Sequence, residues 1–187
     1  LCEYLHLPVQ SGSDEVLARM GRGYTAGEFE RAVSDLRGAV EDLAVSGDIM
    51  VGFPGETEEH HRETLGVIER IAFSRLHVFK YSPRPGTRAF EMGDTVAPEV
   101  KDGRAAEVRR IGRRCASMFH EGFVGRIIQV LVEGPLSTRP GTMFGRSRNF
   151  AGVVFAGSGE LLGRKVRVEV TEAGPDWLEG RLVREDR

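Results

Sequence analysis

The stretch DIMVGFPGET, residues 48–57, is the part of the chain most informative about its fold. Its apolar start predicts a buried strand, and the Gly-Phe-Pro-Gly sequence that follows predicts a sharp exit from that strand. Thr57 can cap a helix that begins with Glu58 and Glu59, because the helix dipole favours carboxylates in the first turn. A strand, a glycine-rich loop and a helix in this order are typical of α/β proteins.

The same order of elements occurs upstream. YLHLPV (residues 4–9) predicts a short buried strand, and DEVLARM (residues 14–20) predicts a short helix that Ser11 or Ser13 can cap. TAGE (residues 25–28) has the pattern of a capping box and opens a longer amphipathic helix. This repetition predicts parallel strands joined by crossover helices.

Downstream, RLHVFKYS (residues 75–82) predicts a third strand. Leu76 lies on one side of it and His77, Phe79 and Tyr81 lie on the other, where the phenylalanine and tyrosine rings offer flat surfaces. Three strands with their helices are too few to close a barrel, and the chain begins with Leu rather than Met. We therefore expect a piece of a longer protein.

The pattern changes after the third strand. From Pro98 a long helix is predicted, with Arg104 among the apolar residues of one seam and basic residues on the other faces. After Gly122, short β-rich runs alternate with glycine-rich turns, which is typical of a small antiparallel barrel. We therefore expect an α/β domain over residues 1–121 and an all-β domain over residues 122–187.

The composition is that of an ordinary globular protein. The 187 residues are 40% hydrophobic and 29% charged with a formal net charge of −2, so a nucleic-acid site would have to be a local patch. No apolar run approaches the ~20 residues that a membrane-spanning helix needs, so no membrane partner is expected. The two cysteines, Cys2 and Cys115, favour a reducing, cytoplasmic setting. They are too few for the thiolates of an iron–sulfur site, so no metal ligand is expected here.

Polar or glycine-rich residues follow the predicted strands. Gln10 and Ser11 can hydrogen-bond a ribose or a base edge, and they equally suit the start of a helix. Gly52 lets the backbone approach a ligand, Pro54 stiffens the loop, and Glu56 can accept hydrogen bonds, while a plain turn explains this loop equally well. Because ligands bind at the carboxyl ends of parallel strands, we expect the three strand exits to share one rim.

The segment from residue 134 to residue 159 of the predicted barrel has three basic residues and contains no acidic residue. Its three arginines are Arg139, Arg146 and Arg148, and Phe144 and Phe150 are interleaved with them. Cations beside aromatic rings on a small barrel are the usual means of binding single-stranded nucleic acid. A flexible hairpin with core phenylalanines explains the pattern equally well.

These motifs together resemble one family closely. The C-terminal half of the radical S-adenosylmethionine (SAM) domain of tRNA methylthiotransferases is similar to LHLPVQSGSDEVLARMGRGYT (residues 5–25), DIMVGFPGETEEHHRETL (residues 48–65) and FSRLHVFKYSPRPGTRA (residues 73–89). The TRAM domain, an OB-like RNA-binding barrel that follows it in that family, resembles residues 124–183, from VGRIIQVLVEG to LEGRLV. The resemblance implies a partial (β/α) barrel followed by a TRAM domain.

The family has three close branches, which act on isopentenyladenosine in tRNA, on threonylcarbamoyladenosine in tRNA, or on an aspartate of a ribosomal protein. PVQSGSD (residues 8–14) differs from the ribosomal branch, which tends to have a His after that Gln. FSRLHVFKYS (residues 73–82) looks most like the threonylcarbamoyladenosine branch. That branch is therefore the expectation, and the isopentenyladenosine branch is the alternative.

The resemblance also implies cofactors and a role for each matching position. The full protein would bind SAM and two [4Fe–4S] clusters and add a methylthio group to C2 of the adenosine next to the anticodon. The positions near SAM would be Gln10, Ser11, Gly52, Pro54, Glu56, Tyr81 and Ser82. The positions that hold the tRNA anticodon stem-loop would be Arg139, Phe144, Arg146 and Arg148.

The family's CxxxCxxC motif and its further N-terminal cysteines are absent from this chain. The resemblance therefore implies no catalytic residue here, and we expect the chain to be inactive without the N-terminal portion of the same polypeptide. Two other classes stay open. An α/β-barrel enzyme that binds a phosphorylated small molecule predicts a phosphate pocket at residues 52–56, whereas a tRNA-binding module without catalysis predicts salt-dependent tRNA affinity and no SAM binding.

Overall fold

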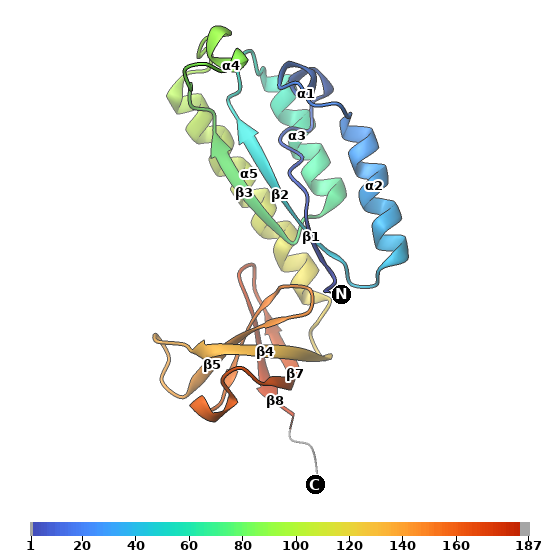
Figure 1. Cartoon of the computed structure of the whole chain (residues 1–187), viewed down its shortest axis with the longest axis vertical. Helices are drawn as coiled ribbons and strands as arrows, with labels where there is room; N and C mark the ends of the chain where they lie inside the picture. The colour runs from blue at the N-terminus through green and yellow to red at the C-terminus, as the bar shows by residue number, and fades with distance from the viewer. Residues whose placement is uncertain (1, 184–187) are drawn as a thin grey trace. The chain divides into compact units, whose positions relative to one another are not determined.

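The computed structural model of the chain describes residues 2–183 (Figure 1). Leu1 and residues 184–187, which belong to the two expected domains, lie outside the described residues. The described chain divides into two compact units: the α/β unit (residues 5–41 and 45–115) and the barrel unit (residues 2–4, 42–44 and 116–183). The expected α/β fold followed by a small closed β-barrel is confirmed.

A three-stranded parallel sheet forms the centre of the α/β unit. Its strands are β1 (Tyr4–His6), β2 (Ala44–Val51) and β3 (Arg75–Lys80), in that order across the sheet. β1 is shorter than expected, because Pro8 has no N–H to donate to its neighbour. Pairing with β2 resumes beyond it, where the Gln10 N–H donates to the Asp48 carbonyl at 2.8 Å.

The four helices predicted from the sequence are present, and the caps predicted at Thr25 and Thr57 are confirmed, whereas Ser13 precedes the first helix without making a side-chain cap hydrogen bond. The helices are α1 (Asp14–Arg19), α2 (Ala26–Ala39), α3 (Glu58–Ile71), α4 (Arg88–Glu91) and α5 (Pro98–Glu121). Thr25 and Glu28 form the expected capping box at α2. At α3, Thr57 forms a capping box with His60, whose ring nitrogen accepts a hydrogen bond from the Thr57 N–H.

The long helices cover one face of the sheet, and Figure 1 shows the strands in front of α3 and α5. Leu76 of β3 packs against α5 at Gly112, where a Cβ would lie 3.1 Å from a Leu76 methyl carbon. Lys80 of β3 pairs with Asp102 of α5 at 2.6 Å. Buried Ile49 and Phe73 fill the space between the sheet and the helices. The opposite face of the sheet has no helix over it in the described part of the chain.

The barrel unit is built from short strands, as expected. They are β4 (Ile127–Pro135), β5 (Thr142–Ser147), β6 (Gly152–Ala156), β7 (Lys165–Ala173) and β8 (Leu178–Leu182), with the 3-10 turn η1 (Gly159–Leu161) before β7. The barrel closes in the order β4-β5-β6-β8-β7, with β6 and β8 as parallel neighbours. Its interior is apolar and includes the fully buried Val130, Val153, Val168 and Leu178.

His120, in the last turn of α5, is expected to make the barrel unit less stable in mild acid. It is buried, and its Nδ1–H donates to the Gly174 carbonyl at 2.6 Å. Burial lowers the pKa of His120 below 6.5, against smaller opposing effects of Gly174 and Asp176. The unfolded chain therefore binds this proton first as the pH falls, and stability present above about pH 6.5 is lost below it.

The urea midpoint of the barrel unit, followed by the fluorescence of the single tryptophan Trp177, measures this effect. Between about pH 7 and pH 5 the midpoint should fall less in His120→Gln than in the parent chain, since Gln can donate the same hydrogen bond and carries no charge. Equal falls in both chains would contradict the role given to His120.

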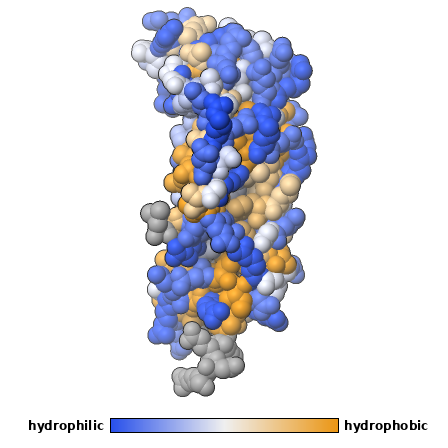
Figure 2. All heavy atoms as spheres, turned by 90° about the vertical axis from the view of Figure 1, so that its right-hand side faces the viewer, coloured by the Kyte–Doolittle hydropathy of each residue, from blue (hydrophilic) through white to orange (hydrophobic). Residues whose placement is uncertain are grey.

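Both cysteines are free: Cys2 is exposed, and Cys115 is buried with Sγ 3.8 Å from the Ile68 carbonyl oxygen. Residues 2–183 contain no group of three His, Cys, Asp or Glu side chains that could hold a metal ion. No helix within this range is long and apolar enough to cross a bilayer. Figure 2 shows hydrophilic residues over most of the visible surface, with smaller hydrophobic areas between them.

Candidate functional site

The three strand exits lie together at the carboxyl end of the sheet. The Tyr81 N–H, just after β3, donates to the Val51 carbonyl at the end of β2 at 2.9 Å. Gln10, after β1, forms an isolated parallel bridge with Ile49 of β2. Phe53 and Tyr81 meet edge to face with their ring centroids 5.4 Å apart. The expectation of one shared rim is therefore met by the backbone geometry.

The exit from β1 is held tightly. Gln10 has a φ of 70°, a left-handed conformation that is uncommon for a residue with a side chain, and it is half-buried. Its N–H and its carbonyl both bond to β2, and these bonds keep the strained backbone in place. Ser11 is buried and its Oγ lies 3.3 Å from the Thr64 hydroxyl of α3. Of these two predicted SAM-site residues, only Gln10 keeps a partly exposed side chain.

The loop after β2 needs its glycines for internal packing. Gly52 and Gly55 have φ values of 72° and 77°. A Cβ on Gly52 would collide with the Lys101 stem, and a Cβ on Gly55 would collide with the Arg19 guanidinium. On the side where a Cβ would lie, the space beside these two glycines is therefore taken by the Lys101 and Arg19 side chains of the chain itself.

Glu56 stabilises the same loop through buried hydrogen bonds. Its carboxylate is buried, and Oε2 accepts hydrogen bonds from the Gly52 N–H at 2.5 Å and from Arg104 Nη1 at 2.8 Å. Arg104 also donates to the Glu56 carbonyl at 3.1 Å. Glu56 Oε1 is buried and has no protein partner among the described residues. The predicted contact of Glu56 with a ligand is therefore limited to this second oxygen, and Pro54 beside it is buried.

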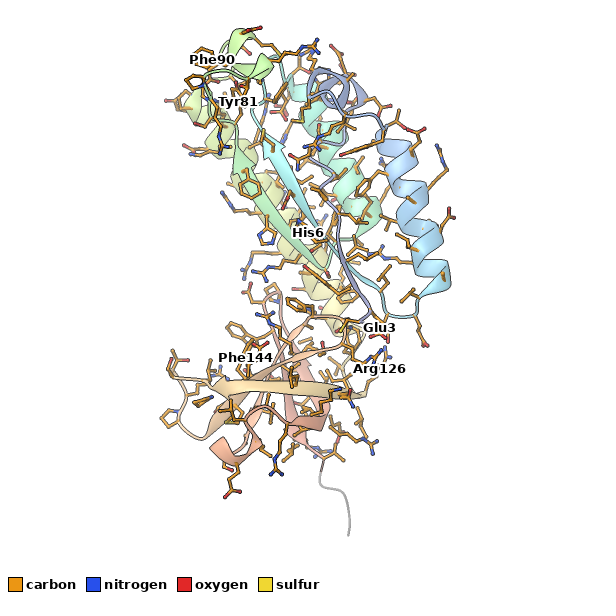
Figure 3. All side chains as sticks on the ribbon, viewed as in Figure 1. Glu3, His6, Tyr81, Phe90, Arg126 and Phe144 are labelled. Atoms are coloured by element: carbon orange, nitrogen blue, oxygen red, sulfur yellow. The ribbon has the colours of Figure 1, made fainter. Side chains whose placement is uncertain are left out.

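Tyr81 does not offer the free aromatic face that the sequence suggested. It is 7% exposed, and its hydroxyl donates to the Ala89 carbonyl at 2.9 Å. The Lys101 ammonium lies 5.3 Å from the ring centroid, and Phe53 covers another side. Figure 3 shows Tyr81 at the end of β3 near α4. Ser82, the next predicted site residue, is exposed.

Two basic residues of α5 were missed as parts of this rim. Lys101 is buried and donates to the Tyr81 carbonyl at 3.2 Å and to Asp94 at 2.5 Å. Arg104, one turn on, holds Glu56 as described above. The position of Arg104 among the apolar residues of the predicted helix was the sequence signal for its burial. Through these two residues α5 makes hydrogen bonds with both the loop after β2 and the loop after β3.

The barrel unit brings together three of its predicted basic and aromatic residues. The Arg146 guanidinium lies 5.5 Å from the ring centroid of Phe144 and 4.6 Å from that of Phe150. Phe144 and Arg146 are two residues apart on β5, so they share a face of the strand. Phe150 is 46% exposed and has a φ of 66°, which marks a strained residue in the turn before β6. We call these three residues the aromatic–arginine stack, and Figure 3 labels Phe144 in it.

Each of the predicted arginines of the barrel has an acidic partner. Arg139 pairs with Glu179 at 2.6 Å, Arg146 with Glu133 at 3.3 Å, and Arg148 with Glu3 at 2.6 Å. The pKa of Glu3 is lowered, chiefly by its hydrogen bond with Arg148. The sequence showed no acid within the basic segment, and the partners come from outside it. A phosphate backbone would have to compete with these carboxylates for the arginines.

Two family profiles match separate parts of the chain. The Radical SAM superfamily profile matches residues 2–68, and the TRAM domain profile matches residues 122–183. The structure of coproporphyrinogen III oxidase from Escherichia coli, described as a radical SAM enzyme, covers 60% of this chain with a TM-score of 0.52. That match covers 27% of the oxidase at 21% identity, so it shows the fold alone.

Curated relatives align with the whole chain. The chain is 41% identical over 186 residues to the tRNA-2-methylthio-N(6)-dimethylallyladenosine synthase of Xanthomonas euvesicatoria, covering 100% of this chain and 38% of the relative. It is 44% identical over 183 residues to the protein of the same name from Erythrobacter litoralis, covering 98% of this chain and 41% of the relative. The chain thus spans about two-fifths of the length of the curated relatives it matches.

Proposed function

We propose that this chain is part of a tRNA methylthiotransferase, the family that the paired matches and the aligned relatives support. In this proposal the chain supplies loops of the SAM site and the RNA-binding barrel. The radical SAM match followed by the TRAM match, with relatives aligned along the whole chain, is the observation that carries this proposal. The substrate we propose is dimethylallyladenosine in tRNA, which the names of both relatives contain. The comparisons do not support the threonylcarbamoyladenosine branch that the sequence motifs suggested.

Radical SAM methylthiotransferases use SAM and iron–sulfur clusters, and these groups supply the radical and sulfur chemistry. The residues of this chain do not fit the clusters, because two cysteines and no three-residue metal group are present within residues 2–183. They fit SAM better, because Glu56 Oε1 is a buried acceptor without a partner among residues 2–183. We propose that the loops at Gln10, Gly52–Glu56 and Ser82 form one wall of the SAM site, and that this chain alone does not methylthiolate RNA.

The barrel unit supplies the RNA-binding step in this proposal. The aromatic–arginine stack can contact an unpaired base through its rings, and Arg139 and Arg148 can contact phosphates. The acidic partners of these arginines compete with RNA for them. Because salt weakens RNA binding more than it weakens close ion pairs, we expect the RNA to be released as the salt concentration rises. A cytoplasmic location, where tRNA is available, goes with this function as part of the same proposal.

Arg146→Ala is expected to weaken binding of an anticodon stem-loop RNA about tenfold. The variant removes a cation that lies beside the two rings of the stack and attracts the RNA, and stacking of a base on an aromatic side chain is worth about 1–3 kcal/mol. Fluorescence anisotropy of labelled RNA at several salt concentrations measures the affinity, and the salt slope should fall by about one.

The matched control is Arg181→Ala, which removes another exposed barrel arginine, paired with Glu169 at 2.9 Å and outside the stack. It should leave the affinity within about twofold of the parent chain. Equal losses in both variants would show that only general charge matters. The absence of any stem-loop binding by the parent chain would overturn the proposed function.

A further inference from the structure

The sheet face without a helix over it has an ordered arrangement of side chains. In the β2–β3 register, Asp48 pairs with His77 and Met50 pairs with Phe79. These positions alternate with Ile49 and Val78, which belong to the helix-covered face. We call Asp48, His77, Met50, Phe79 and the neighbouring His6 of β1 the open face. All five residues belong to the α/β unit.

The half of the open face nearer the start of the strands is polar and held in place. His6 Nδ1 lies 2.9 Å from the Ser46 hydroxyl, and His6 Nε2 lies 3.2 Å from Asp48 Oδ2. The His6 and His77 rings meet edge to face with their centroids 5.8 Å apart. His6 and Asp48 keep 39% and 23% of their side-chain surface exposed, so this network can also bond to a ligand. Figure 3 labels His6, the last residue of β1.

The half nearer the rim is apolar. Phe79 lies near the end of β3 and is 51% exposed. Met50, its register partner, packs against the buried cluster of Val16, Phe53 and Tyr81. A methionine and a phenylalanine form a smooth, adaptable surface for a branched hydrocarbon. Neither residue is used by the SAM wall or the RNA contacts proposed above.

We propose that the open face binds the target adenine, with the N6 hydrocarbon substituent on Met50 and Phe79 and the polar edge of the base at Asp48 and His6. This inference rests on the proposed function and names the part of the chain that recognises its substrate. An N6-alkylated adenine keeps one exocyclic N–H, which can donate a hydrogen bond to a carboxylate such as that of Asp48. It also keeps ring nitrogens that can accept a hydrogen bond from an imidazole N–H. The polar and apolar halves of the face thus match the two halves of this base.

The same arrangement disfavours a threonylcarbamoyl substituent. That group carries a carboxylate, which would lie against Phe79. The two residues of the apolar half, Met50 and Phe79, offer this carboxylate no cation. Arg75, the basic residue of β3 on the open side, is four residues from Phe79, or about 13 Å along a strand. Asp48 adds like-charge repulsion. The open face therefore favours an aliphatic substituent over an acidic one.

Anticodon stem-loop RNAs that differ only at the target adenosine test the inference with this chain. The dimethylallyl form should bind about tenfold more tightly than the unmodified form, and the threonylcarbamoyl form should gain nothing. Phe79→Ala should abolish the preference for the dimethylallyl form. Phe90→Ala, which removes another exposed phenylalanine of the α/β unit (45% exposed, in α4), should keep it.

A second readout is specific to the site. Adding the free dimethylallyl nucleoside should shift the imidazole resonances of His6 and His77 in NMR spectra and leave those of buried His61 unchanged. If all stem-loops bind equally and Phe79→Ala changes nothing, this inference is overturned while the proposed function stands. If the threonylcarbamoyl form binds most tightly, the assignment of the apolar half is overturned. If no stem-loop binds, the proposed function fails and this inference fails with it.

Discussion

Arg104→Ala is expected to lower the free energy of unfolding of the α/β unit by roughly 3–5 kcal/mol, the usual loss when one partner of a buried ion pair is removed. The Arg104 side chain is 8% exposed and that of Glu56 is 1% exposed. Without Arg104, the Glu56 carboxylate would keep only the Gly52 N–H as a partner while remaining out of water. The energy lost is therefore mainly the cost of an uncompensated buried charge.

Urea unfolding followed by circular dichroism at a helix band measures this loss, because the α/β unit holds most of the helix. Trp177 fluorescence follows the barrel unit in the same samples and should not change. The matched control is Arg110→Ala, one to two turns further along α5. Its side chain is 65% exposed and pairs with Glu107 at 3.6 Å, so a loss below about 0.5 kcal/mol is expected.

The double variant Arg104→Met, Glu56→Gln separates charge from packing. It removes both charges and should recover a large part of the loss, since an uncharged pair leaves no buried ion. A loss in Arg104→Ala as small as in Arg110→Ala would contradict the role of this pair. The consequence for function is direct, because the same carboxylate holds the Gly52 turn that we place at the SAM site.

Gly145→Ala is expected to destabilise the barrel unit by about 2–3 kcal/mol, the cost of overpacking a filled core. Gly145 lies on β5 between Phe144 and Arg146 and is buried. A Cβ there would collide with the Leu131 carbonyl oxygen of β4 and lie 2.7 Å from Val130 Cγ1. The backbone of β4 cannot move aside without breaking its own ladder with β5 and β7.

The change in the barrel unit is read from the urea midpoint of Trp177 fluorescence, with circular dichroism as the internal control for the α/β unit. The matched variant is Gly134→Ala on β4, where a new Cβ would meet no described atom within 4 Å. It should be neutral within about 0.5 kcal/mol. Similar midpoints for the two variants would show that the barrel adapts at Gly145 more easily than its geometry implies.

The sequence was sufficient for the longer helices, the strands and their order, although it did not predict the short α4 and η1. Helix starts were correct because capping is local: the Thr25–Glu28 and Thr57–His60 capping boxes form within one turn. The parallel α/β order and the barrel followed from periodicity and glycine spacing. The exit of β1 was less well predicted, since Gln10 adopts a left-handed conformation that no residue type in that segment signals.

The chemistry of the rim could be predicted only in part. The three strand exits do meet, because parallel strands end on the same edge of a sheet. Yet the residues chosen for ligand contact at these exits are mostly buried, and the exposed aromatic ring is Phe79 rather than Tyr81. Alternation places both rings on one side of β3, but it does not say which of them a later helix will cover.

The strands, the longer helices and the second β-rich unit can be predicted from the sequence, because these depend on neighbours within a few positions. The roles of the glycines and charges near the rim become visible in the folded chain. Gly52 makes room for Lys101, and Glu56 is neutralised by Arg104, from a helix far along the chain. The physical reason is that packing space and electrostatic compensation are set by residues that meet only when the chain is folded.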